Sequence, residues 1–323
     1  MLDVRRLRLL RELSLRGTIA AVAEALAFTP SAVSQQLSAL EREAGVPLLE
    51  RTGRRVTLTP AGQKLVHHAE AIFERLEQAT ADLVDTRRGL AGPLRIGTFP
   101  TATRAIVLAA LAFLVHQHPG LEPMVLEIDP AGVAGALRAG DLDVALIHEY
   151  DFVPSPAEPG LAAQPLCTES MYLASTSSAP GEAADGWVIG HWKDSPWITA
   201  TPGTLCHAMT VRACQAAGFT PHVRHQVDDF ATVLALVAAG QGVAVVPHLG
   251  IVDPMPGVTL TRLPIHRRTK IAYRTGAAGH PAVAATAVAL RGSVPRELTC
   301  IEGTPLPRSI PGLPVVYPAS SPC

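Results

Sequence analysis

One segment, Thr29–Leu40 (TPSAVSQQLSAL), restricts the fold more than any other part of the chain. Thr29 can cap a helix by accepting from exposed backbone N–H groups, and Pro30 suits the first helical position. From there apolar residues recur at steps of four, three and four, which places them on one helical face. These residues are Val33, Leu37, Leu40 and Ala44. The segment therefore predicts an amphipathic helix with one buried face.

The opposite face of this helix carries short hydroxyls, amides and one guanidinium. Its members are Ser31, Ser34, Gln35, Ser38 and Arg42. Such groups can enter a major groove and hydrogen-bond base edges and phosphates without burying an unpaired charge. An ordinary surface helix of this length more often shows Glu/Lys pairs. We interpret the segment as a DNA-reading helix, with a plain amphipathic surface helix as the alternative.

The segments on either side of this helix favour DNA recognition. Upstream, Gly17 and Thr18 separate two apolar stripes, which predicts a helix-turn-helix at about 18–37. Downstream, two β-prone runs within 46–58 flank a Thr-Gly turn, as in a short hairpin. The turn carries Arg51, Arg54 and Arg55. We predict a wing that places guanidinium groups beside the duplex or in its minor groove; a solvated basic turn is the alternative.

From Thr18 to Gly62 the chain reads TIAAVAEALAFTPSAVSQQLSALEREAGVPLLERTGRRVTLTPAG, which resembles the DNA-binding domain of LysR-type transcriptional regulators. The resemblance implies DNA contacts from the start of the third helix and from a wing arginine. The DNA-binding residues that we predict are Thr18, Thr29, Pro30, Ser31, Ser34, Gln35, Arg51 and Arg54. Position 35 is often arginine in the family. The amide of Gln35 suits adenine, whereas arginine suits guanine or phosphate, so target sequence or affinity is expected to differ.

Length and charge distribution separate the chain into a head and a body. Its 323 residues exceed what one hydrophobic core normally serves, so two or three units are expected. The overall net charge is −1, but residues 1–60 hold nine Arg/Lys against six Asp/Glu, which leaves +3 on the head and −4 on the remainder. A mildly basic head on an acidic body fits a DNA-binding module attached to a unit that does not bind DNA.

The composition excludes several other classes. The longest apolar run, 105–115, has eleven residues, short of the ~18–20 that span a bilayer. The first residues lack the apolar stretch of a secretory signal, so we expect a cytoplasmic protein with no membrane partner. Five cysteines without a CxxC pair argue against a disulfide scaffold or structural zinc. We expect no metal and no cofactor.

A second long helix is predicted from Pro60 to about residue 89. Its apolar positions alternate in steps of four and three, as in a coiled-coil seam of nearly three heptads. They are Leu65, Ala69, Ile72, Leu76, Ala79 and Leu83. A helix that packs on its own body is the alternative. The resemblance implies a linker helix for dimerisation, hence a homodimer or tetramer, a pseudo-palindromic operator in double-stranded DNA, and RNA polymerase as a partner.

Beyond residue 92, strand and helix patterns alternate, which predicts a parallel α/β body. Prolines within 151–165 suit a crossing between two lobes, and 270–273 can return as a strand to the first lobe. Three short segments are similar to the family's effector-binding domain, which has two periplasmic-binding-protein-like lobes. They are LRIGT (94–98), GDLDVALI (140–147) and AAGQGVAVVP (238–247).

The predicted fold class is therefore α/β with an all-α, winged-helix N-terminal domain. The predicted units are a winged helix-turn-helix (1–59), a linker helix (60–89), a two-lobed effector-binding domain (92–291) and a flexible Pro-rich tail (292–323). Lobe one covers about 92–160 and 268–291, and lobe two covers about 161–267.

The expected ligand site is the crevice beyond the carboxyl ends of the strands, where helix N-termini offer N–H groups. Its predicted effector-binding residues are Thr98, Phe99, Thr101, Thr201, Thr204 and Phe230. The threonines can instead be helix caps only, and Phe230 can instead belong to the core. Asp228 and Asp229 resemble caps more than ligand contacts. Phe99 and the uncharged threonines indicate a small organic acid or an amino acid as the effector.

Three alternatives to a ligand-controlled regulator remain. An enzyme lacks support, since the chain has no GxSxG, HExxH or P-loop sequence. A small-molecule binding protein whose head contacts other partners is opposed by the arginine-bearing wing. A redox-responsive regulator would use Cys206 and Cys214, as in the family's peroxide-sensing branch, whose spacing is one residue longer. Eight residues on an intact helix place sulfurs over ~10 Å apart, so a disulfide requires local unfolding.

Overall fold

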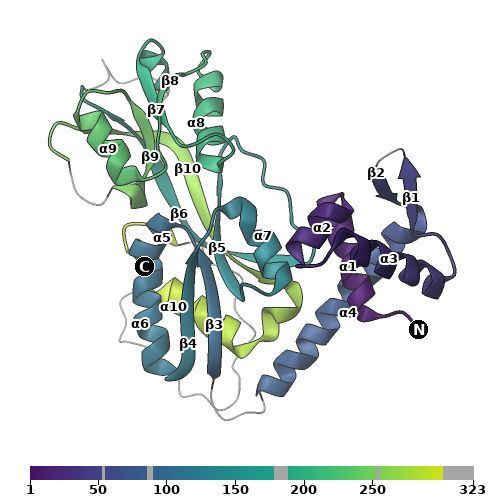
Figure 1. The fold of residues 1–323 in the computed structure, drawn as a ribbon. Coiled ribbons are helices and arrows are strands. Elements are labelled where there is room, and N and C mark those ends of the chain that lie inside the picture. The colour runs from purple at the N-terminus through teal and green to yellow at the C-terminus, as the bar shows by residue number, and fades with distance from the viewer. Residues whose placement is uncertain (53–54, 86–89, 178–187, 252–254, 301–323) are drawn as a thin grey trace.

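The structure, a computed structural model, describes residues 1–52, 55–85, 90–177, 188–251 and 255–300. Figure 1 shows a head of short helices on one side, the long helix α4, and a two-lobed α/β body. This architecture confirms the predicted fold class.

The head is a winged helix-turn-helix. Its elements are α1 (Val4–Arg16), α2 (Ile19–Ala25), α3 (Pro30–Ala44), and the antiparallel hairpin β1 (Leu49–Thr52) and β2 (Arg55–Leu58). The apolar stripes predicted from the sequence meet in one core, which includes the buried Leu10, Val22, Leu37 and Leu40. The chain continues into α4 (Pro60–Asp85), whose first half packs on the same core.

Lobe one lies below lobe two in Figure 1 and receives the chain from α4. Its elements are β3 (Ala91–Thr98), α5 (Pro100–Ala102), the π-helical turn η1 (Thr103–Val107), α6 (Leu108–Gln117), β4 (Gly120–Glu127), α7 (Pro130–Ala139), β5 (Val144–Tyr150), η4 (Thr275–Gly279) and α10 (Pro281–Gly292). Strand β3 lies between β4 and β5 and is parallel to both.

Lobe two contains η2 (Val188–Trp192), β7 (Pro196–Thr199), α8 (Leu205–Ala216), β8 (His222–Gln226), α9 (Phe230–Ala238), β9 (Ala244–Pro247) and η3 (His248–Gly250). Strands β7 and β8 pair in parallel, and a bridge from Trp197 to Val243 joins them to the segment before β9. The fully buried Trp197 side chain lies in the core of this lobe.

Two long antiparallel strands, β6 (Leu161–Ser175) and β10 (Thr259–Arg274), run through both lobes (Figure 1). At one end β10 pairs with β5, and at the other β6 pairs with β9, so the sheet is mixed. Its strand order is β11-β6-β10-β5-β3-β4, where β11 is the short strand Thr299–Cys300. The sequence analysis expected a lobe crossing up to Pro165. The structure instead places Leu161–Pro165 in β6, where a register shift between Thr269 and Lys270 accommodates the proline.

The C-terminal segment differs from the expected tail. Residues before 301 are still part of the fold, because β11 (Thr299–Cys300) pairs with β6 and Leu298 is buried in the lobe-one core. The remainder of the predicted tail lies outside the described residues.

Helical residues Pro100–Gln117 form an apolar stretch longer than the sequence analysis recognised. Among the described residues, this stretch is the one that has the length and composition to cross a membrane, with a mean hydropathy of 1.2. Its inner residues Ile106, Ala110 and Leu114 are buried against the lobe-one sheet, as in the core helix of a globular domain.

Candidate DNA-reading helix and effector cavity

Helix α3 has the geometry that its sequence predicts. The Thr29 hydroxyl caps it by accepting from the Ala32 N–H at 3.2 Å, and Pro30 occupies the first turn. The apolar face is buried, while Ser31 and Gln35 are exposed and Ser34 is half-buried. The predicted contact residues of α3 therefore lie together on its solvent side. Thr18 is also a cap, since its hydroxyl accepts from the Ala21 N–H at 3.2 Å.

A carboxylate of α3 fixes the start of the wing. Glu41 Oε1 accepts from the backbone N–H groups of Leu48 and Leu49 at 2.9 and 3.0 Å. The hairpin therefore leaves α3 in a defined direction. Arg51 stands opposite Val56 in the hairpin register. Arg54, the other predicted wing residue, lies outside the described residues.

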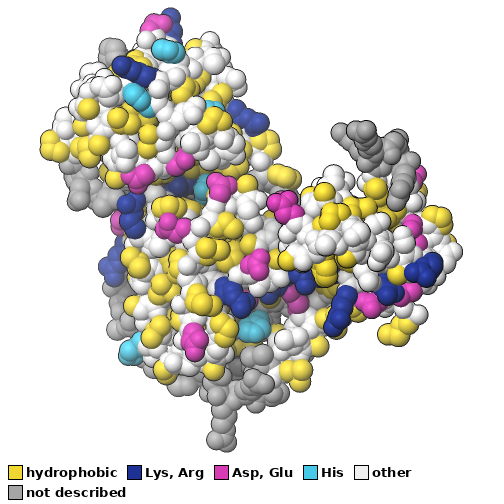
Figure 2. Space-filling view, in the orientation of Figure 1, with side chains coloured by type: hydrophobic (Ala, Val, Ile, Leu, Met, Phe, Trp, Pro, Cys, Tyr) yellow, Lys and Arg dark blue, Asp and Glu magenta, His cyan; other side chains and the backbone are white. Residues whose placement is uncertain are grey.

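A cavity of about 320 Å³ lies between the two lobes. Lobe one contributes Phe99, Pro100, Thr101, Arg104, Glu127, Ile128, Asp129, Pro130, His148 and Tyr150, and lobe two contributes Ala200, Thr204, Leu205, Cys206, Asp228, Asp229 and Phe230. Arg267 of β10 completes the wall. Figure 2 shows acidic side chains gathered where the upper and lower lobes meet. The volume suits a small molecule.

The polar floor of the cavity is organised around Arg267, whose side chain is 2% exposed. Its Nε donates to Glu169 Oε1 at 2.7 Å, and its Nη2 donates to the Thr101 hydroxyl at 2.9 Å. The Tyr150 hydroxyl accepts a further hydrogen bond from the guanidinium. Burial alone would lower the pKa of Arg267, but Glu169 and Tyr150 raise it above its ordinary value. The cavity floor is thus a charged, hydrogen-bonded network.

An aromatic group packs beside this network. The Arg267 guanidinium lies 5.1 Å from the centre of the Phe99 ring, within cation–π range. Phe99 meets His148 edge-on at 4.6 Å between ring centres, and His148 meets Tyr150 at 5.1 Å. Burial, followed by the Arg267 charge, holds the pKa of His148 well below its ordinary value. The imidazole is therefore neutral at pH 7 and adds no positive charge to the cavity.

Three lining carboxylates already accept hydrogen bonds. Asp129 caps α7 by accepting from the Ala131 N–H at 2.8 Å, and Asp229 caps α9 by accepting from the Thr232 N–H at 2.8 Å. Asp228 accepts from the backbone N–H and hydroxyl of Thr201. Asp229 is thus the cap that the sequence indicated, whereas Asp228 caps no described helix and instead binds Thr201; both also line the cavity.

The structure brings four of the six predicted effector residues to the cavity. Phe99, Thr101, Thr204 and Phe230 line it. Thr98 is fully buried behind the wall and donates to the Phe99 carbonyl. Thr201 is outside the lining and donates its hydroxyl to Asp228. Phe230 was interpreted either as a cavity residue or as a core residue, and it is both, because it also packs against Gly250 and the lobe-two core.

Residues that the sequence analysis missed include Arg267, Tyr150 and His148. His148 and Tyr150 end strand β5, so the rule that ligands lie beyond the carboxyl ends of parallel strands pointed to them. The local sequence did not mark Arg267 as a cavity residue, because Arg267 stands between two other basic residues in the sequence HRR at 266–268.

Helix α8 carries two of the chain's cysteines in an unbroken helix. Cys206 lines the cavity, whereas Cys214 lies in the lobe-two core. Burial raises the pKa of Cys206 to about 11 and that of Cys214 to about 12. Within the described residues, no group of three or more His, Cys, Asp or Glu side chains could hold a metal ion.

Comparisons with known proteins agree with this arrangement. Residues 4–63 match the family described as bacterial regulatory helix-turn-helix protein, lysR family, and residues 87–294 match the LysR substrate binding domain. The chain is 30% identical over 253 residues to the nitrogen assimilation regulatory protein nac of Klebsiella aerogenes, which covers 76% of this chain and 79% of that protein.

One further relative is named for hydrogen peroxide, and one solved structure is similar over most of the chain. The "Probable hydrogen peroxide-inducible genes activator" of Mycobacterium avium is 31% identical over 231 residues, covering 71% of this chain and 72% of that protein. The solved structure of an OxyR cysteine mutant from Corynebacterium glutamicum has a TM-score of 0.54 at 26% identity and covers 91% of this chain and 92% of that one. With a helix-turn-helix head and a substrate-binding body that both match, the chain belongs to the LysR family of bacterial transcriptional regulators.

Proposed function

We propose that this protein is a one-component regulator in which a small molecule bound between the lobes changes how two winged-helix heads engage a pseudo-palindromic operator. The observation that carries the proposal is a cavity with a charged floor between the two lobes, on the same chain as a helix α3 whose polar face is exposed. The proposed site of action is the cytoplasm, with RNA polymerase as a partner and no catalytic role. Ligand binding would act by shifting the balance between lobe or subunit arrangements.

The proposed DNA contacts are those of α3 and the wing, with Thr18 and Thr29 acting as caps that can also approach phosphates. The proposed effector contacts are Phe99, Thr101, Thr204 and Phe230, together with the Arg267 network. Thr201 would act through Asp228. A guanidinium, a phenol and hydroxyls around one cavity favour a small ligand with a carboxylate, such as an organic acid or an amino acid.

The test is DNA binding by the full chain, measured by fluorescence anisotropy on the DNA upstream of its own reading frame. Substituting Ser34→Ala and Arg54→Ala together removes one base-reading hydroxyl and one wing charge. We expect sequence-selective binding that the double variant weakens about tenfold or more. A salt series separates phosphate contacts from base contacts. Binding no tighter than to random DNA, with silent substitutions, would support a non-DNA binding protein instead.

The exposed seam of α4 gives a prediction about assembly. Ile72 is 37% and Leu76 is 49% exposed in the single chain, although both belong to the predicted heptad face. Because aspartate cannot pack in a coiled-coil seam, Ile72→Asp/Leu76→Asp is expected to weaken self-association about tenfold or more. Sedimentation velocity over a concentration series measures this. Ala71→Asp/Gln78→Asp places the same two charges at exposed positions outside the seam and should leave association unchanged; equal behaviour of the two proteins would contradict a coiled-coil dimer.

The cysteines of α8 are expected to remain thiols under peroxide. The thiolate is the reacting form, and a pKa of about 11 leaves only about 0.01 per cent of Cys206 ionised at pH 7. Peptide mass mapping after treatment with a small excess of hydrogen peroxide should show no bond between Cys206 and Cys214. Formation of that bond within minutes would favour the redox-responsive alternative, which the peroxide-related names of the relatives keep open.

A further inference from the structure

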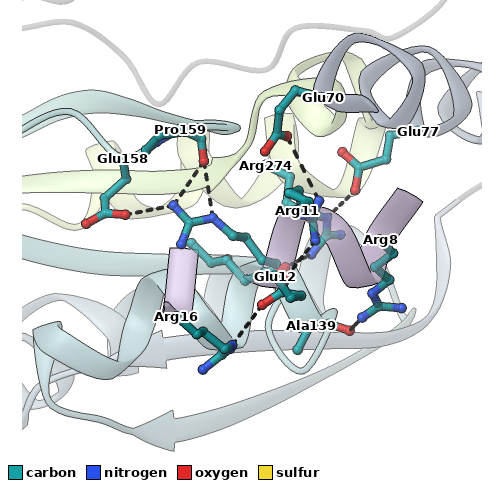
Figure 3. Close-up of polar contacts among 12 residues, drawn as sticks. Arg8, Arg11, Glu12, Arg16, Glu70, Glu77, Ala139, Glu158, Pro159 and Arg274 are labelled. Atoms are coloured by element: carbon teal, nitrogen blue, oxygen red, sulfur yellow. Dashed lines mark hydrogen bonds and ion pairs between the residues drawn. The ribbon is translucent and has the colours of Figure 1, made fainter. Parts of the chain in front are cut away.

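The head contacts the body, because its first helix, α1, lies against lobe one. Figure 3 shows arginines and glutamates of α1 and α4 beside the end of α7 and the turn after β10. Arg8 of α1 donates from Nη2 to the carbonyl of Ala139, the last residue of α7, at 2.9 Å. This bond joins two residues that are 131 positions apart.

Arg274 binds the same end of α7 from within the body. Its Nη1 donates to the carbonyls of Leu137 and Leu142 at 2.7 and 2.8 Å. Its Nε donates to Glu77 of α4, so one guanidinium joins α7 to the linker helix. The carbonyls at a helix C-terminus carry partial negative charge, which makes cations the suitable partners there. Two arginines, from α1 and β10, thus clamp the C-terminal end of α7.

Close backbone approaches accompany these bonds. A Cβ on Gly276 of η4 would lie 2.7 Å from Glu77 Cβ and 2.8 Å from Glu74 Cα in α4. A Cβ on Gly160 would lie 2.7 Å from Glu70 Oε2 of α4. At Gly276 the neighbouring atoms are the Cβ of Glu77 and the backbone of Glu74, so a larger residue would force α4 away from the body. At Gly160 the neighbouring atom is the end of the Glu70 side chain, which can move aside.

Two charged side chains of α1 are buried where this helix packs on α4. Arg11 and Glu12 are 7% and 2% exposed. Glu12 accepts from Arg11 and from Arg16 at 2.9 Å each, and Arg11 Nη1 lies 4.0 Å from Glu70 of α4. Buried charges of this kind require defined partners, so they favour one packing of α1 on α4, the helix that Glu77 joins to the body.

The opposite end of α7 reaches the cavity. Asp129, its N-cap, and Pro130, its first residue, both line the space between the lobes. The helix has ten residues, so it spans about 15 Å from the cavity to the Arg8 contact. One short rigid element therefore touches the proposed ligand site at one end and the DNA-binding head at the other.

We propose that the contacts of Arg8, Arg274 and Glu77 form a latch that fixes the head on lobe one through the C-terminal end of α7, so that a change at the cavity reaches the head through this helix. Transmission from the cavity to the head through α7 rests on the proposed function, since it requires that the cavity binds the effector. The existence of the latch does not rest on the proposed function.

Hydrogen exchange on the full chain tests the latch without DNA or ligand. Arg8→Ala/Glu77→Ala removes the bonds from α1 and α4 and leaves the total charge unchanged. We expect amides of residues 5–16 and 137–142 to exchange about fivefold faster or more, because the facing helices lose their shared contacts. Arg42→Ala/Glu24→Ala, which removes the same two charges from exposed sites on the head, should leave both segments at wild-type rates. Wild-type rates in the latch variant would overturn the latch.

A second comparison tests the connection through α7. Asp129→Ala and Asp229→Ala each remove a helix N-cap at the cavity, from α7 and α9 respectively. Loss of the α7 cap should accelerate exchange in residues 5–16 of α1 about twofold or more, whereas loss of the α9 cap should not. Faster exchange confined to residues 128–142 in Asp129→Ala would overturn the connection.

These outcomes are separable from the proposed function. If the chain fails to bind any operator DNA, the exchange rates still decide whether the latch exists. If the exchange rates contradict the latch, operator binding and ligand response can each remain intact.

Discussion

Replacing Arg267 with methionine is expected to lower the free energy of unfolding of the two-lobed body by about 3–5 kcal/mol. The side chains of Arg267 and Glu169 are 2% and 1% exposed, and they form an ion pair at 2.7 Å. Removing the guanidinium leaves the Glu169 carboxylate buried without its cation, and among the described residues the Leu249 N–H is the hydrogen-bond donor that remains. It also removes the donor to Thr101 and the cation over Phe99. Urea unfolding followed by tryptophan fluorescence measures the loss.

The next residue along the strand supplies the control. Arg268 pairs with Asp151, also at 2.7 Å, but its side chain is 38% exposed. Exposed pairs contribute about 0–1 kcal/mol, so Arg268→Met should change stability little. The double variant Arg267→Met/Glu169→Leu should recover much of the loss, because no unpaired charge remains. Equal effects of the two single variants would contradict the structural role given to Arg267.

This pair shows which part of the site a sequence can predict. The N-terminal caps, the turn and the apolar face of α3 depend on residues within a few positions of one another, so their pattern is visible locally. The Arg267–Glu169 contact joins residues 98 positions apart on two long strands. Its partners follow from the register of β6 and β10, which no local pattern specifies.

The same reasoning explains why four of the six predicted effector residues line the cavity and two do not. Thr98 ends the first strand of lobe one and Thr101 lies three residues later, yet only Thr101 lines the cavity. The sequence places both near the carboxyl end of β3, but the start of α5 decides which hydroxyl faces inward. Likewise Thr201 lies near the cavity but faces Asp228, a residue 27 positions away.

The excess of basic residues in the head indicates a separate domain, but it does not identify the residues that face DNA. The head is basic by count, but Arg8, Arg11 and Arg16 are engaged by Ala139 and Glu12. These guanidinium groups lie on α1 and have partners within the chain, so they add little to the field at α3. The residues that remain for DNA are therefore mostly neutral donors and acceptors of α3 together with the wing.

Gln35 should accordingly read a base. Substituting Gln35→Ala is expected to weaken binding to the wild-type operator by about 1–3 kcal/mol, a fivefold to 150-fold rise in Kd, because an amide can bond adenine at two atoms. The loss should fall at one base pair of each half-site. Anisotropy with a set of operators substituted at single positions would locate it: the variant should no longer distinguish bases at that position.

The adjacent glutamine is the matched control. Gln36 accepts from Arg6 Nε at 2.9 Å and so is occupied within the head. Gln36→Ala removes the same amide from the same helix and should leave the base preference intact. Gln35→Arg adds the guanidinium common in the family and should shift preference at that position toward guanine. If Gln35→Ala and Gln36→Ala weaken all operators equally, position 35 contributes to helix stability and the base is read by other residues of α3 or the wing.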